Sequence, residues 1–183
     1  ISVLAVSASS TLPPGREHEA LRELIYDSDP DLLVVHDARA GTSLPTLQSA
    51  VRAALPNHSF LDGTRLPFVL WRSGFITLVR PREFAVTDAA PLVAQLRMVA
   101  CKTCIVDVSL IVSRAGHLDA ALDLVKQLDE SASRVAPPSA VILVSGVSAA
   151  EAPATWHAAL KSRGLLDAFV AAHSPPEPTG PSD

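Results

Sequence analysis

The sequence is poor in aromatic residues, in cysteine and in long hydrophobic runs. Aromatic side chains make up 4% of its 183 residues, and there are two cysteines. So few aromatic side chains leave little for base stacking, on which many single-strand-binding proteins rely. Two cysteines do not make a disulfide framework in a chain of this length. No apolar run reaches the roughly 18 residues that a membrane-spanning helix needs, and no membrane partner is expected.

Charge is also sparse, whereas apolar residues are abundant. Charged residues make up 19% of the chain and hydrophobic residues 48%, with a formal net charge of −4. This composition excludes global disorder, and the net charge gives no general attraction to nucleic acid. The length suits one domain with its own core. The scarcity of cysteine favours an intracellular compartment without choosing among cytoplasm, nucleus and mitochondrion.

Strand and helix patterns alternate along the chain. Continuous or β-branched apolar segments predict strands, and apolar residues at helical spacing predict helices. The strands are expected at 2–7, 32–35, 68–71, 75–79, 99–110 and 140–144, and the helices at 16–27, 44–55, 118–128 and 155–162. Such interleaving predicts a single α/β domain over residues 1–173. The proline-rich segment 174–183 is expected to be an extended, flexible tail.

Several short motifs follow one another in a fixed order. They are S-V-L-A-V-S from Ser2, D-P-D-L-L-V-V-H-D from Asp29, G-F-I-T-L-V-R from Gly74, V-D-V-S-L from Val106, R-A-G-H-L from Arg114, V-I-L-V-S-G-V-S from Val141 and G-L-L-D-A-F from Gly164. This series resembles the endonuclease/exonuclease/phosphatase superfamily. The resemblance implies the DNase-like fold, a four-layer sandwich of two mixed β-sheets flanked by helices. The family's closing strands have no counterpart, so we expect a sandwich truncated at its C-terminal end.

The resemblance also implies that the first catalytic positions of the family are changed. Its members hold a divalent metal with carboxylates and asparagine, and a histidine polarises the phosphate. The asparagine that ends the first strand corresponds to Ser7, and the metal-binding glutamate corresponds to Asp37. The family's N-T-H segment corresponds to the residues from Asp107 to Ser109, which have no imidazole.

The later positions of the family's site are changed as well. Its D-F-N segment corresponds to the residues from Gly146 to Ser148, and its final S-D-H segment has no counterpart. We therefore expect no catalytic residue, no cofactor and no bound metal, with Asp37 as a weak metal candidate. Ser109 and Gly146 are expected at strand ends near Asp37.

These changes predict a catalytically inactive pseudoenzyme. We expect it to act as a scaffolding subunit of a larger, possibly nucleic-acid-processing, assembly whose protein subunits cover the open sheet edge. One alternative is an eroded Mg²⁺-dependent phosphodiesterase or nuclease. Another is a nucleic-acid-binding module without cleavage, in which arginines such as Arg80 and Arg82 contact phosphates.

Three further patterns have a chemical and a structural interpretation. Cys101 and Cys104 form a CxxC motif, either a redox pair, half a zinc site or, the favoured interpretation, two small hydrophobic residues in a strand. Ser148 lies in a segment resembling a nucleophile elbow, although too few residues follow for a hydrolase fold. His36 and Asp37 are adjacent on a strand and point opposite ways, which favours a capping carboxylate and a partly buried histidine over a proton relay.

Overall fold

The structure is a computed structural model that describes residues 1–61, 66–82, 92–99, 104–113, 118–132, 139–145, 158 and 161–162. The chain divides into one compact unit from Ile1 to Val147 and a second from Ser148 to Asp183. All strands and helices named below belong to the first unit, and the single domain over 1–173 stays a prediction. In the described part of the chain, no helix is long and apolar enough to span a membrane.

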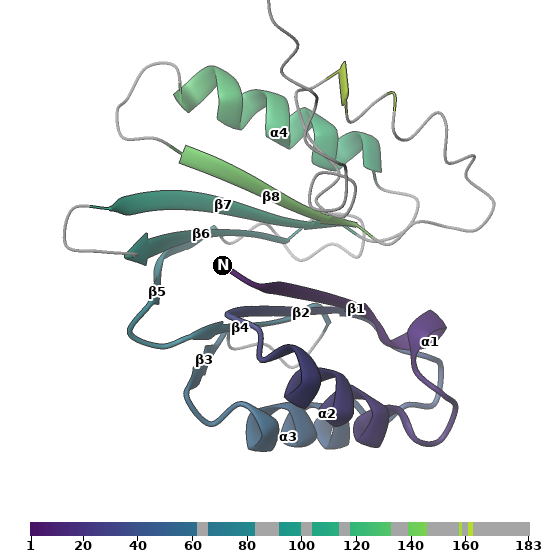
Figure 1. Cartoon of the computed structure of the whole chain (residues 1–183). Helices are drawn as coiled ribbons and strands as arrows, with labels where there is room; N and C mark the ends of the chain where they lie inside the picture. The colour runs from purple at the N-terminus through teal and green to yellow at the C-terminus, as the bar shows by residue number, and fades with distance from the viewer. Residues whose placement is uncertain are drawn as a thin grey trace, which may run out of the picture. The chain divides into compact units, whose positions relative to one another are not determined.

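The first sheet has the strand order β1-β2-β4-β3 (Figure 1). β1 and β2 are parallel, whereas β4 is antiparallel to both β2 and β3, so the sheet is mixed. The strands are β1 (Val3–Ser7), β2 (Leu32–Asp37), β3 (His58–Phe60) and β4 (Phe68–Arg72). The short β3 was not predicted, because three residues directly after a helix give no periodic pattern.

Strand β2 is apolar along most of its length because both of its faces are covered. Leu33 and Val35 pack into the cluster beneath the helices. Leu32 and Val34 pack into the cluster between the two sheets. All four side chains are 0% exposed. The last residue of this strand therefore has a rigid position, which matters for the site described below.

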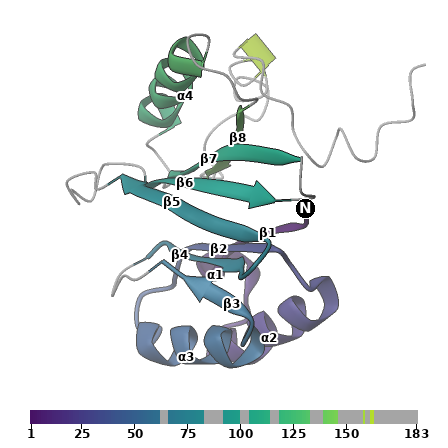
Figure 2. The ribbon, with the colours of Figure 1, turned by 90° about the vertical axis from the view of Figure 1, so that its left-hand side faces the viewer.

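Three helices accompany the first sheet: α1 (Ala8–Thr11), α2 (Glu17–Ser28) and α3 (Leu44–Ala54). α2 and α3 lie side by side on one face of the sheet (Figure 2). α2 ends at Asp29, which adopts a left-handed conformation with φ of 38° and donates its N–H to Ile25 O over 2.9 Å. Pro30 follows, so the helix cannot continue. Both helices lie within a few residues of their predicted ranges.

The second sheet has the order β5-β6-β7-β8, with β7 and β8 parallel and the other pairs antiparallel. Its elements are β5 (Ile76–Arg82), β6 (Leu92–Val99), β7 (Ile105–Ser113), α4 (Leu118–Ala132) and β8 (Ser139–Ser145). The single strand expected at 99–110 is wrong. Val99 ends β6 and pairs with Ile105, the first residue of β7. The apolar content of this region does not reveal where the chain reverses.

The two sheets share an apolar cluster. It includes Leu32, Val34 and Trp71 from the first sheet and Leu96 and Leu110 from the second. Helix α4 buries Ala121, Leu122 and Val125. Two mixed sheets flanked by helices confirm the predicted α/β architecture.

Candidate functional site

The ends of β1 and β2 bring Ser7 and Asp37 together. These strands are parallel, and Ser7 is the register partner of Asp37. Ser7 Oγ donates to Asp37 Oδ2 over 2.8 Å. Helix α1 begins at once after β1, so Ser9 also reaches the carboxylate: its N–H donates to Oδ1 over 3.0 Å and its Oγ donates to Oδ2 over 2.9 Å.

This carboxylate caps the first turn of α1. Partial burial alone would raise the pKa of Asp37, but the hydrogen bonds from Ser9 and Ser7 outweigh it, and the pKa lies below its usual value of 3.8. The interpretation of Asp37 as a capping carboxylate is confirmed. Ser9, the second residue of α1, was not predicted as part of this site, because its contact with Asp37 depends on how α1 follows β1.

His36 lies next to Asp37 in sequence but on the other face of β2. Its side chain is 8% exposed, and its Nδ1 lies 3.9 Å from Asp37 Oδ2. Burial lowers the pKa of His36 below 6.5, against the opposing attraction of Asp37. A buried, neutral imidazole beyond hydrogen-bonding distance does not form a proton relay with this carboxylate.

His36 makes the stability of the protein depend on pH near neutrality. Because the pKa of His36 is lowered from 6.5 on folding, the unfolded state takes up the proton first as the pH falls. The free energy of unfolding should therefore drop between about pH 7.5 and about pH 5.5. In His36→Gln this drop should be smaller, as measured by urea denaturation at both pH values. An unchanged drop in the variant would assign the pH dependence to other groups.

Arg39 lies just beyond β2 and ties the β2–α3 loop to α1. Its Nη2 donates to Ser9 O over 2.7 Å and, more weakly, to Leu12 O over 3.4 Å. Its Nη1 lies 3.8 Å from Glu17 Oε1. The guanidinium therefore connects the loop after β2 with α1 and with the start of α2.

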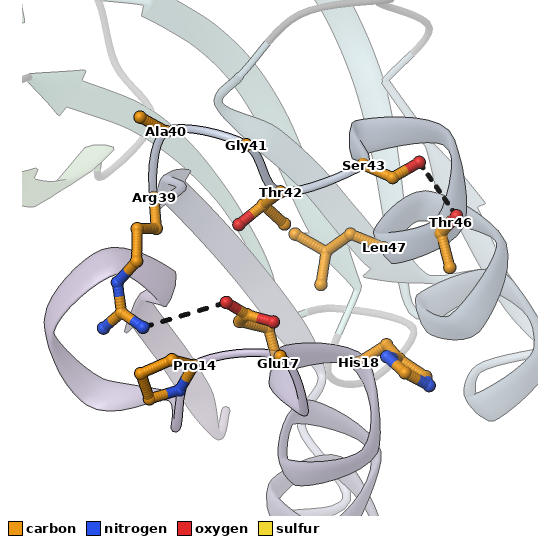
Figure 3. Close-up of a pocket in the computed structure, with 11 residues that line it drawn as sticks. Pro14, Glu17, His18, Arg39, Ala40, Gly41, Thr42, Ser43, Thr46 and Leu47 are labelled. Atoms are coloured by element: carbon orange, nitrogen blue, oxygen red, sulfur yellow. Dashed lines mark hydrogen bonds and ion pairs between the residues drawn. The ribbon is translucent and has the colours of Figure 1, made fainter.

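A pocket of about 370 Å³ adjoins Arg39. Its walls come from the start of α2, the loop after β2 and the start of α3, and include Thr42 and Thr46. In Figure 3, Arg39 and Glu17 point toward each other, whereas His18 points away from both. Because the two opposite charges face one another, the pocket carries little net charge on its walls.

Asp107 lies away from the capped strand ends. It is near the start of β7, where it faces its register partner Arg97 on β6. Arg97 Nε donates to Asp107 Oδ1 over 2.7 Å, and Arg97 Nη2 donates to Oδ2 over 3.1 Å. This hydrogen bond lowers the pKa of the Asp107 carboxyl. Asp107 is thus one half of a cross-strand ion pair on the second sheet.

The expected position of Ser109 at a strand end is wrong. β7 continues to Ser113, so Ser109 lies in the middle of the strand. Ser113 is the strand-end residue: it is 0% exposed and is the register partner of Ser145 at the end of β8. The motif did not reveal where β7 ends, because an apolar strand gives no internal mark of its end. Gly146 and Ser148 lie outside the described residues.

Strands β1 and β7 run in the same direction in Figure 1. Ser113 therefore ends its strand on the same side as Ser7 and Asp37. Asp107 precedes Ser113 by six positions on β7. At the rise of an extended strand, this separation puts Asp107 about 20 Å from Ser113, toward the opposite end of the strand. The strand ends on the Asp37 side carry serine hydroxyls rather than further carboxylates.

The described residues do not fit a Mg²⁺ site. Mg²⁺ takes near-octahedral oxygen ligands, usually carboxylates together with water or phosphate. Within the described ranges, no group of three or more His, Cys, Asp or Glu side chains is placed to hold a metal. Asp37 Oδ2 already accepts two hydroxyl hydrogen bonds, and Asp107 is paired with Arg97.

Two other interpretations have partial answers. Cys104 is disulfide-bonded, so its interpretation as a small hydrophobic residue is wrong, and Cys101 lies outside the described residues. Arg80 and Arg82 lie on β5, but their side chains are outside the described part. Arg72 forms ion pairs with Asp29 and Asp31, and is therefore not free to contact phosphates.

No family model and no curated protein matches the sequence. Solved structures do match, and the three described next each have a TM-score of 0.54. A humanized D. rerio TDP2 with 14 mutations is 10% identical, and the match covers 92% of this chain and 72% of that chain. D. rerio TDP2 complexed with a single-strand DNA product is 15% identical, with 92% and 66% covered. An endonuclease/exonuclease/phosphatase family protein from Bacteroides thetaiotaomicron is 14% identical, with 79% and 61% covered.

These likenesses establish the fold. The chain has the DNase-like fold, as the order of its motifs implied. It spans between 61% and 72% of the length of the three matching chains named above.

Proposed function

We propose that this chain is a catalytically inactive domain with the DNase-like fold, which serves as a structural subunit of a larger assembly. The observation that carries the proposal is the state of Asp37. Its carboxylate accepts hydrogen bonds from Ser7 and Ser9 and caps α1. Its role is therefore structural.

The neighbouring strand ends support the same proposal. Ser7 and Ser113 carry neutral hydroxyls, which titrate far above neutral pH and are poor general acids or bases by themselves. A general acid or base contributes roughly 10²–10⁴-fold to a rate. Among the described residues, the carboxylate of Asp37 is already hydrogen-bonded and no general base adjoins it. Such a site would retain little hydrolytic turnover.

The apolar core of the described residues supports a structural role. Both sheets contribute to buried apolar clusters, and β2 is covered on its two faces. The buried apolar core stabilises the fold, although the strand ends carry serine. A scaffold needs this stability. The partners would be protein subunits, since the net charge of −4 does not favour nucleic acid.

An assay of hydrolysis tests the proposal. The protein is incubated with Mg²⁺ or Mn²⁺ and single-stranded DNA, RNA or a phosphomonoester, beside a sample with chelator. Single-stranded DNA is included because one structural match, D. rerio TDP2, is complexed with a single-strand DNA product. We expect the same rate with and without metal, in the wild-type protein and in Asp37→Asn.

Metal-dependent turnover that Asp37→Asn abolishes would overturn the proposal in favour of an eroded phosphodiesterase. Asparagine keeps an acceptor for the Ser9 N–H, so the variant should remain folded, which circular dichroism checks. Turnover that persists unchanged in Asp37→Asn would point to a contaminating nuclease, and the proposal would stand.

A further inference from the structure

The segment that links β6 to β7 contains the CxxC motif and a disulfide. Cys104 directly precedes β7 and is disulfide-bonded. The sequence has one other cysteine, Cys101, so the bond joins these two residues. Cys101 itself lies outside the described part of the chain. The bond therefore closes a loop of four residues, from 101 to 104.

The pairing of β6 with β7 does not depend on this bond. Eight consecutive register pairs join the two strands, and the last of them pairs Val99 with Ile105. One face of this ladder contributes buried residues, such as Leu96 and Leu110, to the apolar cluster between the sheets. The disulfide lies beyond the last register pair, so its cleavage leaves these contacts in place.

So short a loop gives the disulfide little effect on folding. A disulfide stabilises the folded state mainly by restricting the unfolded chain, and the effect grows with the length of the closed loop. In this model, a loop of four residues stabilises the folded state about twentyfold, whereas a loop of about 100 residues does so about three-thousandfold. The same factor separates the reduction equilibrium of the folded protein from that of the unfolded chain. The folded protein therefore resists reduction only slightly more than an unfolded CxxC segment does.

The disulfide is also accessible to a reductant. Cys104 is exposed, and so are Val99 and Ile105, the pair that ends the ladder beside it, at 39% and 42%. Thiol–disulfide exchange requires that a thiolate reach a sulfur of the bond. Exposed disulfides that contribute little to folding are the ones that exchange readily, whereas structural disulfides resist reduction.

We propose that the bond between Cys101 and Cys104 is a site of thiol–disulfide exchange, which a dithiol reduces while the domain stays folded. This inference is independent of the proposed structural role. One thiolate of the dithiol attacks a sulfur of the bond and forms a mixed disulfide, and the other cysteine leaves as a thiolate that takes up a proton. The second thiol of the dithiol then cleaves the mixed disulfide. The dithiol departs as a disulfide, and two electrons have passed to the protein.

Reduction of the full chain by dithiothreitol tests the site. A maleimide coupled to polyethylene glycol labels free thiols, and a gel shift counts them. The count should rise from zero to two, and the rate constant in native buffer should lie within about tenfold of that in concentrated urea, because the bond is accessible in the folded protein. Oxidised glutathione should return the count to zero. Circular dichroism should show that the reduced protein remains folded.

Cysteine variants separate exchange at this site from other effects of the reagents. Cys101→Ser and Cys104→Ser each leave one thiol, which should form a mixed disulfide with one glutathione under native conditions, as measured by intact mass. The double variant is the matched control and should take up none. Its folding equilibrium constant should equal that of the reduced wild-type protein. The oxidised wild-type protein should exceed both by no more than about twentyfold in urea denaturation.

Three results would each overturn the inference. One is reduction more than about a hundredfold slower in native buffer than in urea, because the bond would then be shielded by the fold. Another is unfolding of the protein on reduction, which would make the bond structural. The third is a reduced protein that oxidised glutathione does not convert back to the disulfide. Hydrolytic activity would refute the proposed function without affecting these results, so the two failures are distinguishable.

Discussion

Phe68→Ala should lower the free energy of unfolding by about 3–5 kcal/mol, the usual cost of removing a buried phenylalanine. Phe68 is 1% exposed on β4 and belongs to the cluster between the first sheet and its helices. Its ring lies 5.9 Å from that of Phe60, measured between centroids. Alanine would leave a cavity that the surrounding strands cannot close, because they are fixed by their sheet pairing. Urea denaturation at neutral pH measures the loss.

Tyr26→Ala is the matched control for this change. Tyr26 is 63% exposed on α2, and the guanidinium of Arg22 lies 6.0 Å from the centroid of its ring. A surface substitution of this kind should change the free energy of unfolding by about 0.5 kcal/mol or less. Equal losses in Phe68→Ala and Tyr26→Ala would contradict the packing described for the first sheet.

Asp37→Ala should be the second most costly change, at about 1–3 kcal/mol, because it leaves the Ser9 N–H and two hydroxyls without their acceptor. The Asp37 side chain is 37% exposed, so water replaces part of what is lost. Asp37→Asn keeps one side-chain oxygen and should lose less. Both variants are compared with wild type by urea denaturation.

The effect of Asp37 should also depend on pH. Its folded-state pKa lies below the ordinary 3.8, so the stabilisation is fully present above that value and is lost as the pH falls through the folded-state pKa. The difference between wild type and Asp37→Ala should therefore be constant near neutrality and shrink below about pH 3.8. A difference that instead grows in acid would show that Asp37 is not held as a charged acceptor.

The elements with strong local patterns could be predicted from the sequence. The segment 32–35 is continuously apolar because β2 is buried on both faces, and Asp29 and Pro30 mark the end of α2. The hairpin between β6 and β7 could not be located, because valine and isoleucine occur on both sides of the reversal at Val99 and Ile105. Strand pairing is decided by contacts between residues far apart in the chain, which local periodicity does not encode.

The candidate site was predictable only in part. Ser7 and Asp37 were assigned to one site because the family resemblance places both at its metal site, and the structure joins them by a hydrogen bond. Ser109 was misplaced, since a motif of apolar residues has no unique register. The role of Arg39 depends on the path of the loop after β2, which brings its guanidinium to the carbonyl of Ser9. Such a path has no signature in the sequence.

Each sheet is drawn from one continuous half of the described chain, residues 3–72 for the first and 76–145 for the second. The first layer can thus assemble while the ribosome is still making the second, because its strand pairings need no residue beyond Arg72. Leu32, Val34 and Trp71 then face water until the later half arrives to cover them. During that interval, the nascent chain exposes an apolar surface of the kind that chaperones bind. The rate of translation sets how long this surface stays exposed.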